Sequence, residues 1–248
     1  MSMLLEAHEL TRYFDIGRNQ RVHAVEKVSL EVAEKEIVGL VGESGSGKST
    51  FGKTVVGLHA KTSGTVKFRG ETLPQKYHPA DFQRLAIKMQ MIFQDPYSSL
   101  NPRMTVGEII AEGLRLHTNI NSASAKEQVA EWLERVGLQA DHMSRYPHEF
   151  SGGQRQRIGI ARALILEPEF VVCDEPISAL DVSVQAQVIN LLGDLKDKMG
   201  LTLLFIAHDL SMVRYVSDRM AVMYLGSLVE VGKPTKCTSA PSTLTRRS

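Results

Sequence analysis

A glycine-rich stretch, Gly42-Glu-Ser-Gly-Ser-Gly-Lys-Ser49, stands between an apolar run and a segment with helical spacing. It fits the pattern G-x(4)-G-K-[ST], in which glycines let the backbone wrap with its N–H groups pointing inward. The run Glu36–Val41 before it has the composition of a short buried strand, and Ser49–Leu58 after it predicts a helix. A strand that turns sharply into a helix presents N–H groups and a positive helix end to an anion. The junction therefore predicts an α/β sheet with a phosphate-binding loop.

The loop residues have separate expected tasks. The Lys48 ammonium should reach the β- and γ-phosphates of a nucleotide, and the Ser49 hydroxyl should bind Mg²⁺. The residues expected to surround the phosphates are Gly42, Glu43, Ser44, Gly45, Ser46, Gly47, Lys48, Ser49 and Thr50.

A second apolar run, Phe170–Cys173, ends in the two acids Asp174 and Glu175. In an open α/β sheet, ligands bind beyond the carboxyl ends of the strands. Asp174 is therefore expected in the Mg²⁺ shell, and Glu175 is expected to orient or deprotonate the attacking water. An acidic pair at a strand end is more often a solvated turn, and the phosphate loop upstream favours the catalytic interpretation instead.

The segment Ser151-Gly-Gly-Gln154 precedes a pattern in which Ile158, Ala161 and Ile165 share one helical face. It predicts a helix that begins just after the glycines, with a second anion-binding N-terminus. The alternative is an ordinary capped helix. Two phosphate-type sites in one chain indicate two nucleotides, or one nucleotide shared across a dimer.

The pattern of polar and apolar residues predicts three regions along the chain. Strands come first, a mainly helical region follows, and strands and helices alternate after it. Polar and apolar residues alternate in two N-terminal stretches, and glycines bracket a third strand. The expected strands are Leu4–Phe14, Val22–Val32, Gly64–Gly70 and Leu203–Ile206. The expected helices include Ser124–Val136, which Gly137 should end, and Val184–Met199. We therefore expect an α/β fold with a mainly parallel core sheet, an N-terminal antiparallel β subdomain and an inserted helical subdomain at about 96–151.

Three motifs in this order resemble the nucleotide-binding subunit of an ATP-binding cassette (ABC) transporter: Gly42–Ser49, Ser151–Gln154 and Asp174–Glu175. Gln94 is similar to the Q-loop glutamine, and Ser178-Ala-Leu-Asp181 to the D-loop. His208, just after an apolar strand, is similar to the switch histidine. The resemblance covers residues 4–232 and implies a P-loop NTPase core, one ATP-binding domain and ATPase activity.

The resemblance also implies roles for single residues. Phe14 occupies the place of the aromatic residue that stacks on adenine, with Tyr13 as the alternative, although Phe14 could instead belong to the core. ATP and Mg²⁺ are the implied cofactors. The implied metal ligands are Ser49, Gln94 and Asp174. The implied catalytic residues are Glu175, His208 and Gln94. The residues implied to complete the nucleotide site across a dimer are Ser151, Gly152, Gly153, Gln154 and Asp181.

Three longer segments resemble one branch of this family. The segments 92–106, 150–158 and 178–187 resemble the importers of oligopeptides, dipeptides, nickel and similar solutes, and the chain is most similar to the second of their paired ATPase subunits. Phe150 stands where the family commonly has Leu, and Ile177 where Thr is frequent. Neither change removes a phosphate-contacting group.

This branch implies a heterodimer with a second ABC ATPase subunit, two transmembrane permease subunits and, indirectly, an extracytoplasmic solute-binding protein. The residues after Gln94 would contact the permease. The implied location is peripheral, on the cytoplasmic side of the cell (inner) membrane. The solute itself is set by the other components.

Composition excludes several other classes. Lys and Arg total 29 and Asp and Glu 28, so the net charge of +1 argues against a nucleic-acid partner. Cys173 and Cys237 are too few for a disulfide framework and indicate unpaired thiols in a reducing compartment. The longest nearly apolar run, Leu201–Ala207, is far shorter than the roughly 20 residues of a membrane-spanning helix. The first residues lack a signal-peptide pattern.

Three other classes of nucleotide-binding protein would need sequence features different from those of this chain. A cassette ATPase of DNA repair or translation would carry a second cassette, a long coiled coil or a zinc insertion, and the sequence has none of these features. A GTP-binding switch would need Asn-Lys-x-Asp, which does not occur. A scaffold that binds ATP without hydrolysis would not need Glu175 and His208.

The resemblance stops at Gly232, where a polar tail, 233–248, begins without periodicity. One interpretation is an ordinary frayed terminus. Codons permitted for Gly232–Ser248 can also be chosen so that a shifted frame reads E-T-D-E-V-Y-V-G-P-L-H-P-Y-T-P-L, which is similar to the family continuation. We therefore expect a frameshift near Gly232, which sequencing of the gene would test.

Overall fold

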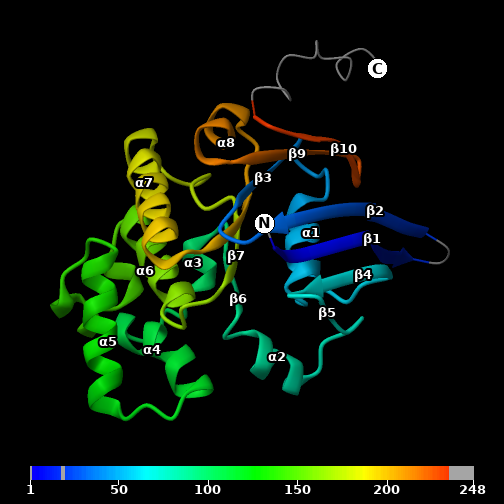
Figure 1. Cartoon of the computed structure of the whole chain (residues 1–248). Helices are drawn as coiled ribbons and strands as arrows, with labels where there is room; N and C mark the ends of the chain where they lie inside the picture. Colours follow the sequence, from blue (N-terminus) through cyan, green and yellow to red (C-terminus); the bar gives the residue numbers. More distant parts are fainter. Residues whose placement is uncertain (1, 18–19, 235–248) are drawn as a thin grey trace. The chain divides into compact units, whose positions relative to one another are not determined.

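The computed structural model describes residues 2–17 and 20–234. The described residues form two compact units, one made of those up to residue 77 together with those from 202 onward, and the other of 78–201 (Figure 1). Within the described ranges, no helix has both the length and the apolar character needed to cross a membrane. The predicted irregular tail from residue 235 onward, with Cys237 and the proposed frameshift product, lies outside the described residues.

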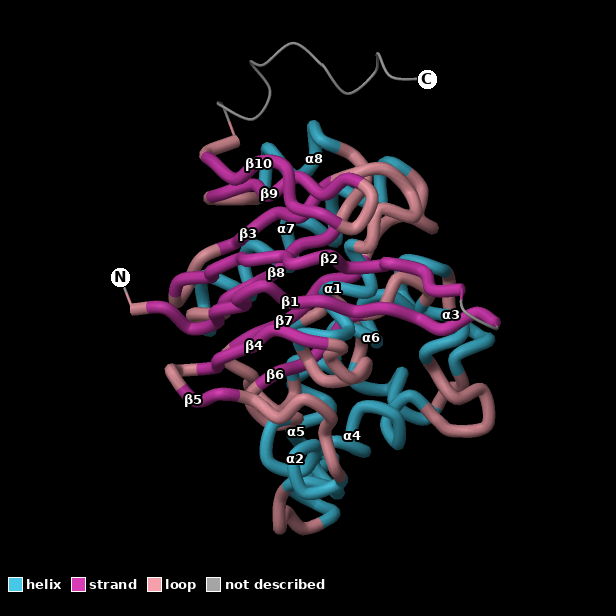
Figure 2. The backbone as a smooth tube through the Cα atoms, turned by 90° about the vertical axis from the view of Figure 1, so that its right-hand side faces the viewer, coloured by secondary structure: helices cyan, strands magenta, loops and turns pink. Residues whose placement is uncertain are grey.

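The first unit contains an antiparallel sheet in the order β2-β1-β4-β5 (Figure 2). Its strands are β1 (Met3–Gly17), β2 (Gln20–Ala33), β4 (Ser63–Phe68) and β5 (Glu71–Thr72). Alternation in the sequence becomes a buried face, on which Leu5, Ala7 and Val28 are fully enclosed. The predicted N-terminal antiparallel subdomain is confirmed.

The same unit holds the strands that carry the phosphate loop. β3 (Ile37–Val41) lies between β8 (Thr202–Ile206) and β9 (Arg219–Tyr224), parallel to both, and β10 (Ser227–Gly232) is antiparallel to β9. Every residue of β3 and β8 is buried, which explains their continuous apolar composition. The prediction of a mainly parallel core is confirmed.

Among the described residues of this unit, two segments are helical, α1 (Lys48–Val55) and α8 (Leu210–Val216). Helix α1 ends at Val55, whereas the sequence predicted a helix that continues to Leu58. Its end is set by Gly57, which has φ 82°, and the Tyr77 ring lies 2.3 Å from where a Cβ on Gly57 would stand. Only glycine fits this left-handed, crowded position, so the helix ends there.

The second unit pairs the parallel strands β6 (Met89–Ile92) and β7 (Phe170–Asp174) and is otherwise helical. Its α-helices are α2 (Pro79–Leu85), α3 (Pro96–Ser99), α4 (Val106–His117), α5 (Ser122–Arg135), α6 (Gly152–Leu164) and α7 (Val182–Met199). Two 3₁₀ helices, η1 (Ala140–Ser144) and η2 (Pro147–Glu149), precede α6.

Sequence reasoning did not anticipate β5, α2, β6, α8, β9 or β10. Helix α2 begins with a recognisable signal, because Pro79 stands at its first position and the Asp81 carboxylate accepts the His78 N–H at 2.9 Å. Strand β6 has only four residues, and its apolar side chains come from Met and Ile within a mixed sequence.

Candidate functional site

The phosphate loop joins β3 to α1, as predicted, and its shape depends on two glycines. Gly42 has φ 156° and Gly47 has φ 98°. A Cβ on Gly47 would stand 2.0 Å from the Ala24 carbonyl oxygen, and one on Gly42 would stand 2.2 Å from the Met223 carbonyl oxygen. Any larger residue would collide with backbone, so the loop can only close around glycine at these two positions.

Lys48, the first residue of α1, folds back across the loop. Its side chain is 4% exposed, and its Nζ donates to the carbonyl oxygens of Gly42 at 2.8 Å and Glu43 at 2.9 Å. These bonds connect the two ends of the loop and hold a positive charge beside the first N–H groups of α1. The arrangement suits a bound anion, since charge and helix N-terminus act together.

The turn between β9 and β10 supports this loop from behind. The Gly226 N–H donates to the Ser46 carbonyl at 3.0 Å, and the Glu26 N–H donates to the Gly226 carbonyl at 2.7 Å. Gly226 has φ 82°, and a Cβ there would stand 2.7 Å from the His23 carbonyl oxygen. Sequence reasoning missed this contact, although a glycine between two short apolar runs is a recognised turn signal.

His208 follows β8 by two residues. Because β8 is parallel to β3, with Ile206 opposite Leu40, both strands end at the same edge of the sheet. The Ala207 N–H continues the pairing by donating to the Leu40 carbonyl at 3.2 Å. His208 is exposed at the edge where the phosphate loop begins.

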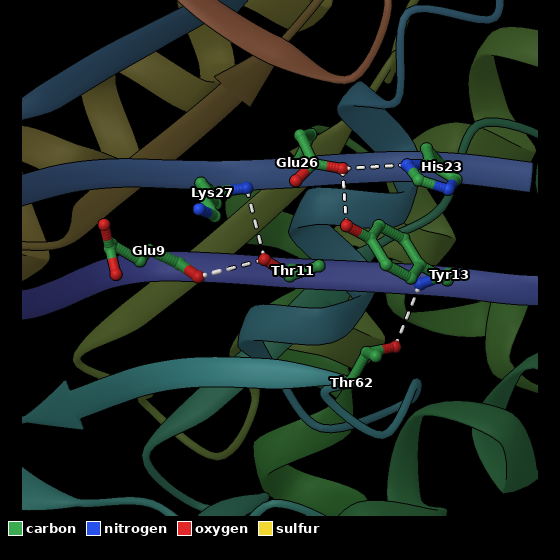
Figure 3. A network of polar contacts seen from close by, with 7 residues as sticks. All are labelled: Glu9, Thr11, Tyr13, His23, Glu26, Lys27 and Thr62. Carbon is green, nitrogen blue, oxygen red and sulfur yellow. Dashed lines mark hydrogen bonds and ion pairs between the residues drawn. The ribbon is translucent and has the colours of Figure 1, made fainter.

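Tyr13, one of the two aromatic candidates for the base, is engaged within the β1–β2 hairpin (Figure 3). Its ring stacks on His23, with centroids 4.0 Å apart, and its hydroxyl donates to Glu26 Oε2 at 2.6 Å. This hydrogen bond lowers the pKa of the Glu26 carboxyl and raises the pKa of the Tyr13 hydroxyl. The Tyr13 N–H also donates to Thr62 Oγ1 at 3.0 Å. Tyr13 therefore holds two strands and a loop together.

Phe14, the other candidate, has different neighbours. The Arg12 guanidinium carbon lies 4.4 Å from the ring centroid, and the His59 ring meets Phe14 edge to face at 5.4 Å. Desolvation by burial is the main cause that lowers the pKa of His59, and the Arg12 and Lys53 charges add to it. Phe14 is half-buried and forms no hydrogen bond through its side chain, so its ring can pack against another planar group.

In the second unit, parallel pairing of β6 and β7 places Gln94 and Glu175 together. Glu175 follows β7 directly and Gln94 follows β6 by two residues, and Gln94 Nε2 donates to Glu175 Oε2 at 2.9 Å. Glu175 has φ 45°, a strained left-handed conformation for a residue with a side chain. Strain of this kind gathers at functional sites.

Asp174, the last residue of β7, is 2% exposed. Its neighbour Cys173 is fully buried, and burial together with the Asp174 charge raises the pKa of the thiol to about 12. The thiol is therefore neutral. The predicted reduced state of Cys173 agrees with its burial as a free cysteine.

Ser151 caps the N-terminus of α6 as the sequence predicts. Its Oγ accepts the Gln154 N–H at 3.3 Å, and Gln154 Oε1 accepts the Ser151 N–H at 3.0 Å. Gln154 thus has a structural task in this box, in addition to its predicted place in a nucleotide site. Ser151 and Gly152 are exposed.

The glycines of this motif pack against the segment that follows Glu175. A Cβ on Gly153 would stand 2.4 Å from Val184 Cγ1, whereas one on Gly152 would meet only Leu180 Cδ2, at 3.5 Å. Ser178 donates to the Glu175 carbonyl through its N–H and its hydroxyl, at 3.3 and 3.2 Å.

Asp181, at the start of α7, is exposed. Close packing of α6 against α7 therefore brings the residues of the Ser151–Gln154 and D-loop motifs into one neighbourhood.

Comparison with known proteins identifies the family of this chain. Residues 25–178 match the family model described as "ABC transporter". The chain is 58% identical over 229 residues to the putative oligopeptide transport ATP-binding protein YkfD of Bacillus subtilis, covering 92% of this chain and 69% of the relative. It is 52% identical over 240 residues to the oligopeptide transport ATP-binding protein OppF of Escherichia coli K12, covering 93% of this chain and 71% of the relative.

Among solved structures, the chain is similar to the ATP-binding cassette MJ0796 in a dimeric, post-hydrolysis state bound to ADP and phosphate. The TM-score is 0.84 at 26% identity, covering 93% of this chain and 98% of the other. The phosphate loop, the capped α6 and the acidic end of β7 thus occur in a chain whose fold and sequence match the same group of proteins. The chain belongs to the ABC transporter family.

Proposed function

We propose that this chain is the ATP-binding and ATP-hydrolysing subunit of an ABC importer for peptides or related small solutes. The observation that carries the proposal is the loop around Lys48, where glycine geometry, a held ammonium and a helix N-terminus converge on one place for phosphate. Relatives that bear the names of oligopeptide transport ATP-binding proteins support the peptide class.

In this proposal, ATP lies with its adenine on Phe14 and its phosphates on residues 42–50. Glu175 orients or deprotonates the attacking water, and Gln94 holds the Glu175 carboxylate in place through its amide. His208 stabilises the transferring phosphoryl group. The transition state is mainly positional and electrostatic, so groups held in advance contribute most of the rate.

The candidate metal ligands fit Mg²⁺ by their chemistry. Ser49 offers a hydroxyl, Asp174 a carboxylate, and Gln94 its amide oxygen, because its Nε2 is already donating to Glu175. When bound, Mg²⁺ would neutralise charge on the β- and γ-phosphates.

The proposed assembly contains a second, different ABC ATPase subunit. That subunit would meet Ser151–Gln154 and Asp181 of this chain across a shared nucleotide. Two permease subunits would contact the residues after Gln94, and a solute-binding protein would act outside the cell. The chain would sit on the cytoplasmic face of the inner membrane, with 4–232 as its ATP-binding domain and 96–151 as the inserted helical part.

Substitution of Glu175 tests the hydrolytic role. Glu175→Gln keeps the shape of the side chain and removes the base, so ATPase turnover of the reconstituted transporter should fall about 10²–10⁴-fold while ATP still binds. The exposed Glu131→Gln on α5 is a matched control and should leave turnover unchanged. Unchanged turnover in Glu175→Gln would remove this residue from the reaction.

A further inference from the structure

Helix α3 lies beside α6 (Figure 1). Two arginines of α6 contact α3 through their side chains. Arg155, in the first turn of α6, places its guanidinium carbon 4.4 Å from the centroid of the Tyr97 ring on α3. Arg162, two turns further along, donates through Nη1 to the Ser99 carbonyl at the end of α3. Residues spaced by seven lie on one face of a helix, so both arginines point to the same neighbour.

Arg155 also donates two hydrogen bonds to backbone carbonyls. Its Nε donates to the Pro147 carbonyl at 2.7 Å, and its Nη2 donates to the His148 carbonyl at 3.3 Å. These carbonyls belong to η2, which leads directly into the cap at Ser151. One planar side chain therefore joins α3, the approach to the cap and the first turn of α6, and a lysine could not make the same fork.

The other end of α3 leads to the candidate catalytic carboxylate. The helix is capped by Asp95, whose Oδ1 accepts the Tyr97 N–H at 2.7 Å, and this bond lowers the pKa of Asp95. Gln94 comes directly before the cap and donates to Glu175. Through these contacts, a displacement of α6 at Ser151 would move α3 and the Gln94 amide with it.

We propose that Arg155 is a positioning residue that couples the Ser151–Gln154 motif to the Gln94–Glu175 pair through Tyr97. This inference rests on the proposed ATPase function and adds a named route from the Ser151–Gln154 motif to the candidate catalytic carboxylate. Tyr97 contributes its ring face alone, because its hydroxyl has no partner among the described residues and its side chain is 66% exposed.

The first experiment measures ATPase kinetics of the reconstituted transporter. Arg155→Lys and Tyr97→Ala should each lower kcat about 2- to 30-fold, the usual range for residues that carry coupling, with KM for ATP nearly unchanged. Tyr97→Phe keeps the ring and should restore the wild-type rate. Arg145→Lys, at an exposed ion pair with Asp141, is the matched control. The double variant Arg155→Lys/Tyr97→Ala should be no slower than the worse single variant.

A second readout needs no ATPase activity. In the full chain alone, hydrogen exchange of amides 95–99 should be about 2- to 30-fold faster in Arg155→Lys than in wild type or Arg145→Lys. Unchanged exchange there, or losses of kcat that multiply in the double variant, would overturn the coupling role. A wild-type transporter without ATPase activity would instead refute the proposed function, and the exchange result would still decide whether Arg155 holds α3.

Discussion

Gly153→Ala tests whether glycine at this position of the Ser151–Gln154 motif is required by packing before any ligand binds. The new Cβ would stand 2.4 Å from Val184 Cγ1 on α7. A β-branched side chain in a helix has one strongly preferred rotamer, so Val184 cannot turn away without cost. Overpacking of this kind costs about 1–3 kcal/mol. Against this, replacing a helical glycine by alanine gains up to about 1 kcal/mol.

Gly159, in the same helix, separates the two effects, because a Cβ there meets no heavy atom within 4 Å outside the backbone of its own helix. Urea unfolding of the full chain should show Gly153→Ala less stable than Gly159→Ala by about 1–3 kcal/mol. Adding Val184→Ala should recover most of the difference, whereas Gly152→Ala should be nearly neutral. Equal stability of Gly153→Ala and Gly159→Ala would refute the packing argument.

Three further predictions concern other parts of the chain. In a Cys237→Ser background, Cys173 should resist thiol reagents at pH 8 until the chain unfolds. Burial raises the pKa of this thiol in the folded chain to about 12, above its ordinary value of 9.0, so the free energy of unfolding should be unaffected by this group below pH 9 and should fall as pH rises from 9 toward 12. Phe14→Ala should raise the KM for ATP at least about fivefold through lost stacking, whereas Tyr13→Phe should leave KM unchanged and lower the melting temperature. Affinity purification of the chain from its native membrane should recover a homologous but different ATPase chain, and recovery of a transporter with two copies of this chain as its only ATPase would contradict the heterodimer.

Local sequence was sufficient to predict the role of a residue wherever that residue acts through its own backbone or its immediate neighbours. Gly47 is predicted by the turn it must make, and Ser151 by the helix it caps with Gln154. The pairing of Gln94 with Glu175 needed the structure, because the sequence did not predict β6, the strand that leads to Gln94.

Contacts between distant segments could not be predicted in this way. Glycine is required at position 153 because Val184 packs against it, and the Ser46 carbonyl in the phosphate loop is held by the Gly226 N–H. Neither contact can be predicted from the motif alone, because the partner residue lies far away in the sequence. The choice between Tyr13 and Phe14 depends on irregular pairing of β1 with β2, where several register shifts decide which side chain meets Glu26. The frameshift near Gly232 stays a prediction.

The most direct measurement is uptake of a labelled oligopeptide by cells whose own copy of the gene is replaced. Lys48→Ala removes the ammonium that holds the carbonyls of the phosphate loop, so uptake should be abolished. Lys126→Ala, which removes an exposed charge on α5, should transport like wild type. Peptide uptake that continues at the wild-type rate in Lys48→Ala would contradict the claim that this chain powers the importer.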